Sequence, residues 1–328
     1  MPRDAMSPVA AAEVSKVRKM AFEFFYSCAQ HCVFCSSSES LSKLKNRPYA
    51  VRDVCRVLVQ KRRLGVDRLM LVGSGEPLLH PGILTILGAA KKLGMRTFVI
   101  TNGAKLSEPA FARHALALLD ELCLSIHGDD AALHDRLTRA PGAFRRSLKA
   151  LERIRSRAGV SLMTNTVVCM ENRDRVERII EFLAGQGVER CQLANVAPEG
   201  RAGEAFRKLA VPLDWWRAKV PLFARLARER GVTLTFDGLP LCVLGPRRGA
   251  STDVGFIPVL WVKLSMDDGA LRLSEELRTR ETRDRAPIAA CAGCAEIDEC
   301  GWVFTRYTEL FGTAELKPIR RGGGHDAR

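Results

Sequence analysis

Three cysteines lie within one eight-residue segment near the start of the chain, Cys28, Cys32 and Cys35, with the spacing C-x3-C-x2-C. A structural zinc ion takes four protein ligands, whereas three thiolates on a [4Fe-4S] cube leave one iron open. His31 is adjacent to Cys32 and is therefore badly placed to join the same metal. The spacing favours an iron–sulfur cluster over zinc, and either metal over three unrelated core cysteines.

A second cysteine group lies toward the C-terminus. Cys291, Cys294 and Cys300 give the spacing C-x2-C-x5-C, and Cys242 is available upstream as a fourth ligand. Four thiolates can hold a second iron–sulfur cluster or a zinc ion in a ribbon-type site, so both alternatives stay open. The remaining cysteines fall singly on apolar faces and are expected in the core: Cys55, Cys123, Cys169 and Cys191.

Short apolar runs alternate with amphipathic segments from residue 20 to about residue 236, which predicts a parallel sheet with crossover helices. The predicted strands are residues 20–26, 68–72, 96–100, 122–126, 162–168 and 192–196. The apolar stripes of the predicted helices start at Val51, Ile83, Phe111, Phe144, Val176 and Trp215, with a kink expected at Pro221. Gly65, Gly94 and Gly159 are placed to end three of these helices. Six βα units fit a partial (β/α)6 TIM-like barrel in the α/β class.

The composition changes after Asp237, where Gly, Pro and Cys become more frequent, so we place a domain boundary near Phe236. Residues 259–264 and 270–273, separated by Asp267-Asp268-Gly269, predict a hairpin. The expected division is an N-terminal extension (1–19), the partial barrel (20–236), a small cysteine-rich α+β domain (237–316) and a flexible tail (317–328).

The 328 residues carry 51 Lys plus Arg and 37 Asp plus Glu, a formal net charge of +14. The basic residues fall mostly on helical faces without interleaved aromatic residues, so solvated surface explains them better than nucleic-acid binding, while an anionic substrate stays open. Apolar residues make up 47% of the chain, which excludes a disordered protein. No signal peptide and no membrane-spanning run is expected, which favours a cytoplasmic location.

Polar residues and glycines follow successive predicted strands, where the loops of a barrel converge. Gly73-Ser74-Gly75-Glu76 follows the second strand, Thr101-Asn102-Gly103 the third and Ser125-Ile126-His127-Gly128 the fourth, while Asn165 lies in the fifth. Each motif alone is also compatible with an ordinary turn or cap.

With the cysteine spacing, these motifs resemble the radical S-adenosylmethionine (radical SAM) superfamily, whose third cysteine follows an aromatic residue, here Phe34. The resemblance implies that the open iron binds the amino and carboxyl groups of SAM and that Phe34 packs near the adenine. It further implies SAM contacts from Gly73, Ser74, Gly75, Glu76, Asn102, Ser125, Arg139 and Asn165. Ser74 departs from the family's glycine-glycine-glutamate-proline pattern, and Thr138 stands where several peptide-modifying relatives have the arginine.

The C-terminal cysteines resemble the SPASM and shorter twitch extensions of radical SAM enzymes. This resemblance implies one auxiliary [4Fe-4S] cluster on Cys242, Cys291, Cys294 and Cys300, because Ser274 and Phe304 stand where a full SPASM domain has further cysteines. The whole resemblance spans residues 20–316.

The chemistry implied by the resemblance is reductive cleavage of SAM to a 5′-deoxyadenosyl radical that abstracts hydrogen from the substrate, so no side chain is expected to be the abstracting group. The main hypothesis is modification of a peptide, as in the maturation of natural products. The alternatives are a dehydrogenase or mutase acting on a sugar, nucleotide or cofactor precursor, and a non-catalytic zinc or redox-sensing protein.

The same resemblance implies a flavodoxin- or ferredoxin-type electron donor. Because 19 residues precede the first predicted strand, a leader-binding domain is not expected before the barrel. A peptide substrate would then be recognised at the barrel mouth or by a separate small protein.

Overall fold

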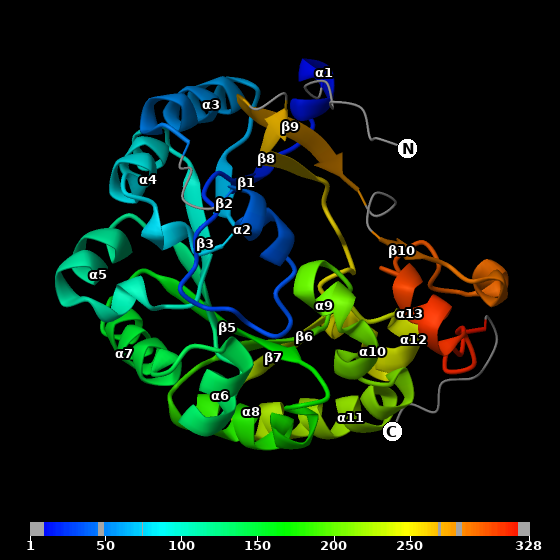
Figure 1. The fold of residues 1–328 in the computed structure, drawn as a ribbon. Helices are drawn as coiled ribbons and strands as arrows, with labels where there is room; N and C mark the ends of the chain where they lie inside the picture. The colour runs from blue at the N-terminus through cyan, green and yellow to red at the C-terminus, as the bar shows by residue number, and fades with distance from the viewer. Residues whose placement is uncertain (1–9, 45–48, 74, 268–269, 280–283, 321–328) are drawn as a thin grey trace.

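The structure is a computed structural model that describes residues 10–44, 49–73, 75–267, 270–279 and 284–320. Its main feature is a curved nine-stranded sheet in the order β7-β6-β5-β4-β3-β2-β1-β8-β9, with helices on its outer side (Figure 1). The first seven strands are β1 Lys19–Glu23, β2 Arg68–Leu71, β3 Arg96–Thr101, β4 Glu121–Ser125, β5 Ser161–Val168, β6 Arg190–Asn195 and β7 Thr233–Asp237. All neighbouring pairs among them are parallel, which confirms the predicted architecture.

The helices that cover the sheet start close to the predicted positions. They are α3 Val51–Arg63, α4 Ile83–Lys92, α5 Pro109–Leu116, α7 Ala143–Arg155, α8 Val176–Gly185 and α11 Leu213–Glu229. Further helices, which the sequence analysis did not predict, are α1 Ala11–Val14, α2 Ser38–Leu44, α6 Ala131–Thr138, α9 Gly200–Glu204, α10 Phe206–Leu209, α12 Leu241–Leu244 and α13 Thr305–Phe311. Gly65 and Gly94 follow α3 and α4 with φ of +100° and +69°, so they end these helices as expected.

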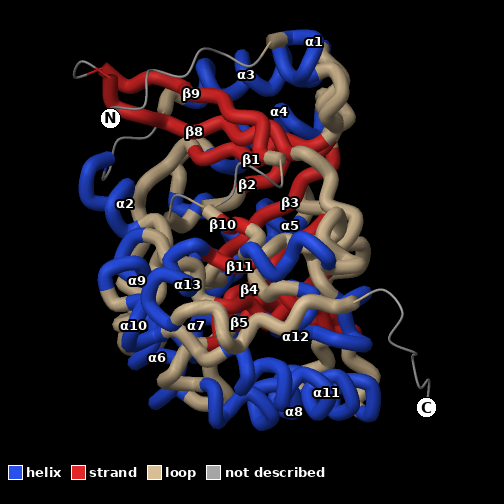
Figure 2. The backbone as a smooth tube through the Cα atoms, turned by 90° about the vertical axis from the view of Figure 1, so that its right-hand side faces the viewer, coloured by secondary structure: helices blue, strands red, loops and turns tan. Residues whose placement is uncertain are grey.

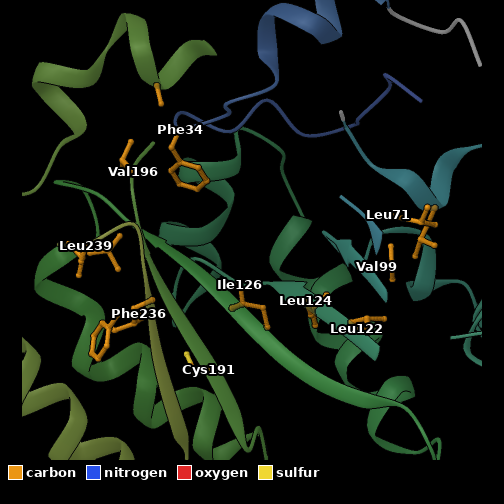
Figure 3. Close-up of a cluster of buried hydrophobic side chains, with 14 of the residues drawn as sticks. Phe34, Leu71, Val99, Leu122, Leu124, Ile126, Cys191, Val196, Phe236 and Leu239 are labelled. Atoms are coloured by element: carbon orange, nitrogen blue, oxygen red, sulfur yellow. The ribbon is translucent and has the colours of Figure 1, made fainter. Parts of the chain in front are cut away.

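The core lies between the strands and the outer helices. Leu122, Leu124 and Ile126 are fully buried and point to the same side of β4, where they lie among apolar residues of neighbouring strands (Figure 3). Ser125 and His127 alternate with them along the chain and line a pocket on the opposite face. This period of two separates a packed face from the face that can carry chemistry.

The predicted hairpin is confirmed as β8 Val259–Asp267 and β9 Ala270–Arg278, while its turn residues Asp268 and Gly269 lie outside the described residues. β8 pairs in parallel with β1, so the sheet continues past the boundary placed near Phe236. Figure 2 shows the hairpin beside β1, next to α3, and Lys61 of α3 forms an ion pair with Glu275 of β9. The division into domains stays a prediction.

A smaller element, formed by β10 Arg285–Ala286 and β11 Val303–Phe304, lies between the hairpin and α13 in the chain. The buried ion pair between Arg285 and Asp253 joins it to the segment that follows β7. Within the described part of the chain, no helix has the length and apolar character needed to span a membrane.

Candidate functional site

The cysteine loop, which we define as residues 27–37, follows β1 and is held by backbone hydrogen bonds. The N–H groups of His31 and Val33 donate to the carbonyl groups of Thr138 and Leu137, each at 2.9 Å. These carbonyls belong to the last turn of α6, where helix carbonyls have no partner within the helix. The end of α6 therefore fixes the middle of the cysteine loop.

All three thiols of this loop line one pocket of about 240 Å³. Most of the residues predicted to contact SAM line the same pocket: Phe34, Gly73, Gly75, Glu76, Asn102, Ser125 and Asn165. They come from the loops after β1, β2 and β3, from the end of β4 and from within β5, so the barrel brings together motifs that are far apart in the sequence.

Of the two remaining predicted SAM contacts, the structure places only Arg139. Ser74 lies outside the described residues. Arg139 lines a different pocket, with Asp135 and Arg136. It is the left-handed residue that ends α6, with a φ of 49°, and the structure does not place it with the cysteines.

Glu76 is buried in the pocket wall, and both of its carboxylate oxygens are already engaged. Oε1 accepts hydrogen bonds from the Thr101 hydroxyl at 2.7 Å and from the Leu78 N–H at 3.2 Å, and Oε2 accepts one from the Asn102 N–H at 2.7 Å. All three donors are neutral, and burial raises the pKa of Glu76 to about 7. In this structure Glu76 joins the turn after β2 to the end of β3.

Two asparagines of the pocket have their amide groups oriented by neighbours. Asn102 Nδ2 donates to Cys28 Sγ at 3.5 Å, while its Oδ1 accepts from the Ala104 N–H at 2.9 Å. Asn165 Oδ1 accepts from Gln192 Nε2 at 3.1 Å, which leaves the Asn165 amide nitrogen to donate. The pocket therefore presents hydrogen-bond donors beside the thiols.

His127 also lines the pocket, where its ring packs edge-on against Phe34 with 4.7 Å between ring centroids. The Val167 N–H donates to His127 Nδ1 at 3.2 Å, so in the neutral ring the proton is on Nε2. Burial lowers the pKa of His127 well below its usual value. The ring is therefore an uncharged part of the wall that supports Phe34.

The thiols of the loop are partly buried, and this desolvation raises the pKa of Cys28 to about 11 and that of Cys32 to about 12. Metal ligation requires the thiolate form, so a bound cluster has to displace these protons. Desolvation also raises the pKa of Cys35, and the positive charge of Arg201 opposes the rise at Cys32 and Cys35 without reversing it.

Arg201 and Gly200 were missed by the sequence analysis. Arg201 donates from its guanidinium to the Cys32 carbonyl at 2.8 Å and from its backbone N–H to the Cys35 carbonyl at 3.0 Å. No local motif marks these residues, and only the topology places α9 against the cysteine loop. The one available signal was a glycine–arginine pair after the sixth strand.

The four C-terminal cysteines, Cys242, Cys291, Cys294 and Cys300, line one narrow and mostly apolar pocket of about 20 Å³. Cys300 Sγ accepts hydrogen bonds from the Leu241 N–H at 3.4 Å and the Trp302 N–H at 3.3 Å.

The donor sets of the two cysteine groups differ in how well they fit iron–sulfur clusters. Among the residues that the structure describes, no group of three or more His, Cys, Asp or Glu side chains is arranged to hold a single metal ion. The three front thiols line a pocket with free volume and an amide donor to one sulfur, which fits a cluster. The C-terminal thiols share one pocket but have less room.

Comparisons with known proteins give the family and the relatives that the chain resembles. A family model for the radical SAM superfamily matches residues 22–183. The chain is 31% identical over 222 residues to a PqqA peptide cyclase of Ruegeria pomeroyi, which covers 67% of this chain and 58% of that protein. It is 28% identical over 188 residues to an AdoMet-dependent heme synthase of Methanosarcina barkeri, and this match covers 57% of this chain and 53% of that protein. The match thus spans little more than half the length of these curated relatives.

Among solved structures, the fold is similar to that of Streptococcus suis SuiB bound to S-adenosylmethionine. The TM-score is 0.61 at 17% sequence identity, and the match covers 94% of this chain and 77% of that one. At this identity the likeness shows a shared fold.

Proposed function

The chain belongs to the radical SAM superfamily through residues 22–183, and from this premise we propose that it is an enzyme that cleaves SAM reductively and modifies a peptide. The observation that carries the proposal is that one pocket joins Cys28, Cys32 and Cys35 to the glycines and polar groups that follow β2 and β3 or lie on β4 and β5. The family implies a [4Fe-4S] cluster on the three thiols, with SAM beside it.

When bound, the cluster and SAM supply a reducing electron and a 5′-deoxyadenosyl radical. The side chains of this protein would bind the cluster and SAM and orient them. The cysteine loop holds the cluster, and Asn102 donates to the Cys28 sulfur. Gly73 and Gly75 line the pocket beside the thiols, and Ser125 and Asn165 offer polar groups to the same pocket. Phe34 supplies the apolar surface expected beside an adenine.

A peptide is the substrate class we propose, because the PqqA peptide cyclase is the relative with the longer match. The similarity to an AdoMet-dependent heme synthase favours one alternative, a radical SAM reaction on a tetrapyrrole or another small cofactor precursor.

We also propose that Cys242, Cys291, Cys294 and Cys300 hold one auxiliary [4Fe-4S] cluster, with zinc as the competing metal. The support is that all four thiols line one pocket and that two backbone N–H groups donate to Cys300. A flavodoxin- or ferredoxin-type donor and a separate leader-binding protein are the proposed partners.

The experiment that tests the proposal is formation of 5′-deoxyadenosine by anaerobically reconstituted protein given SAM and dithionite. Cys32→Ala should abolish the product, whereas Cys55→Ala, a matched change on α3 outside the pocket, should not. Absence of product from wild-type protein with a full complement of iron would contradict the proposal. Precursor peptides and porphyrins are then added separately to the active protein. A true substrate should stimulate the formation of 5′-deoxyadenosine and should itself change in mass.

A further inference from the structure

The segment Glu199–Arg201, at the start of α9, contacts the backbone of the cysteine loop. The Arg201 N–H donates to the Cys35 carbonyl at 3.0 Å and lies 2.6 Å from Ser38 Oγ. The Arg201 guanidinium donates to the Cys32 carbonyl at 2.8 Å. The carbonyl groups of the second and third cysteines are thus both fixed by one residue that follows β6.

The approach of this segment to the loop is close because residue 200 is glycine. Gly200 has a φ of +54°, and a Cβ at this position would lie 2.5 Å from the Ser36 carbonyl oxygen and 2.7 Å from that of Cys35. Any side chain would push the two segments apart. The contact between α9 and the cysteine loop therefore depends on two features, the absence of a side chain at Gly200 and the guanidinium of Arg201.

Arg201 brings a positive charge to the loop without a partner carboxylate. Among the described residues it forms no ion pair, and its guanidinium bonds to a neutral carbonyl. It does not line the cofactor pocket but a second pocket of about 350 Å³. The two pockets share Cys28, Gln30 and Leu41, so Arg201 stands beside the loop away from the proposed SAM-facing wall.

We propose that Arg201 is a positioning residue that holds the cysteine loop and supplies the positive charge that favours reduction of its cluster. The proposal rests on the proposed function, because it assumes a cluster on Cys28, Cys32 and Cys35. A cluster with three thiolates becomes more negative by one charge when it is reduced, and a nearby cation stabilises the more negative form. Cluster potentials respond to net charge and to the groups around the sulfurs.

The test is the midpoint potential of the front cluster in wild-type protein, Arg201→Gln and Arg201→Lys. The potential is measured without SAM by redox titration followed by electron paramagnetic resonance, and the front cluster is identified by the signal that SAM changes. Arg207→Gln is the matched control, because it removes one positive charge from α10, where Arg207 lies over the Phe311 ring. Iron content and thermal unfolding of the metal-free proteins are measured in parallel.

We expect Arg201→Gln to shift the midpoint potential to a more negative value than wild type, Arg201→Lys to shift it less, and Arg207→Gln to leave it unchanged. Loss of front-cluster iron in Arg201→Gln alone, with metal-free unfolding equal to that of Arg207→Gln, would also support the positioning role. An unchanged potential at full iron content in Arg201→Gln would overturn the proposal. If wild type forms 5′-deoxyadenosine, that failure concerns Arg201 alone, whereas wild type without product contradicts the proposed function itself.

Discussion

The Glu76 carboxylate accepts a 2.7 Å hydrogen bond from the Thr101 hydroxyl, so the turn after β2 is joined to the last residue of β3. Its second oxygen accepts from the N–H of Asn102, and the Asn102 amide in turn reaches the sulfur of Cys28. A continuous polar connection therefore runs from a buried acid to a thiol of the proposed cluster site. Its donors are neutral, which leaves the carboxyl group without a compensating positive charge.

Glu76→Gln should change how stability depends on pH. The pKa of Glu76 is raised to about 7 in the folded protein from 4.5. As pH rises through this window, the unfolded chain loses the proton while the folded protein keeps it, so wild type loses about 3 kcal/mol of stability. Glu76→Gln lacks this loss of stability.

Urea unfolding of metal-free protein is measured at pH 5 and pH 7.5. The unfolding free energy of Glu76→Gln should increase relative to that of wild type as pH rises, whereas that of Glu152→Gln, a change on the exposed surface, should not. A constant difference between Glu76→Gln and wild type would contradict the assignment.

His134 should produce the opposite dependence on pH. Its Nδ1 accepts from the His127 N–H at 3.1 Å, and its Nε2 is buried without a hydrogen-bond partner among the described residues. Burial lowers its pKa from 6.5 to about 4. Below pH 6.5 the unfolded chain takes up a proton that the folded protein does not, so wild type loses about 3 kcal/mol as pH falls to 4.

His134→Asn keeps an acceptor for the His127 N–H but removes the titrating ring. In urea unfolding it should therefore gain on wild type as pH falls from 6.5 to 4. Because Glu76 acts with opposite sign over an overlapping range, the wild-type profile alone identifies neither group. Parallel profiles for His134→Asn and wild type would show that His134 does not titrate as inferred.

Local periodicity was sufficient to predict the six strands, the outer helices and the hairpin, since each depends on residues a few positions apart. β7 (Thr233–Asp237) was missed because it ends at the composition change that was interpreted as a domain boundary. The pairing of β8 with β1 could not be predicted, because it joins segments more than 200 residues apart. The contact between Arg201 and Cys32 has the same cause, at a separation of 169 residues.

In the candidate site, too, local sequence features could be predicted and contacts between distant segments could not. Cysteine spacing and strand-end glycines identified most of the residues that line the pocket. Sequence patterns do not encode which atoms of Glu76 are already occupied, or that Arg139 ends α6 and lines another pocket. Such details depend on side-chain packing across neighbouring strands.

Gly73→Ala should destabilise the protein by about 1 to 3 kcal/mol. Gly73 has a φ of +75°, and a Cβ there would lie 2.3 Å from Glu23 Oε1, which also accepts from Trp261 Nε1 at 2.8 Å. Part of the cost is backbone strain and part is displacement of Glu23. In a double-mutant cycle measured by urea unfolding, Glu23→Ala should reduce the cost of Gly73→Ala. Gly88→Ala, in α4 with open space around it, is the control and should be neutral or stabilising. If the losses of unfolding free energy from Gly73→Ala and Glu23→Ala simply add, the Glu23 side chain does not hinder a Cβ at position 73.

Cys294→Ala distinguishes an auxiliary cluster from an unrelated set of cysteines. Cys242, Cys291 and Cys300 share its pocket, so loss of one ligand should release a whole cube. We expect iron to fall by about four atoms per chain relative to wild type and Cys55→Ala, while 5′-deoxyadenosine formation at the front cluster remains measurable. Elemental analysis also distinguishes an iron–sulfur cluster from a zinc ion, because Cys294→Ala in a zinc site would lose about one zinc and no iron. Unchanged iron and zinc would exclude a metal role for these four thiols. Loss of all iron would instead show that the C-terminal pocket is needed for the front cluster to assemble.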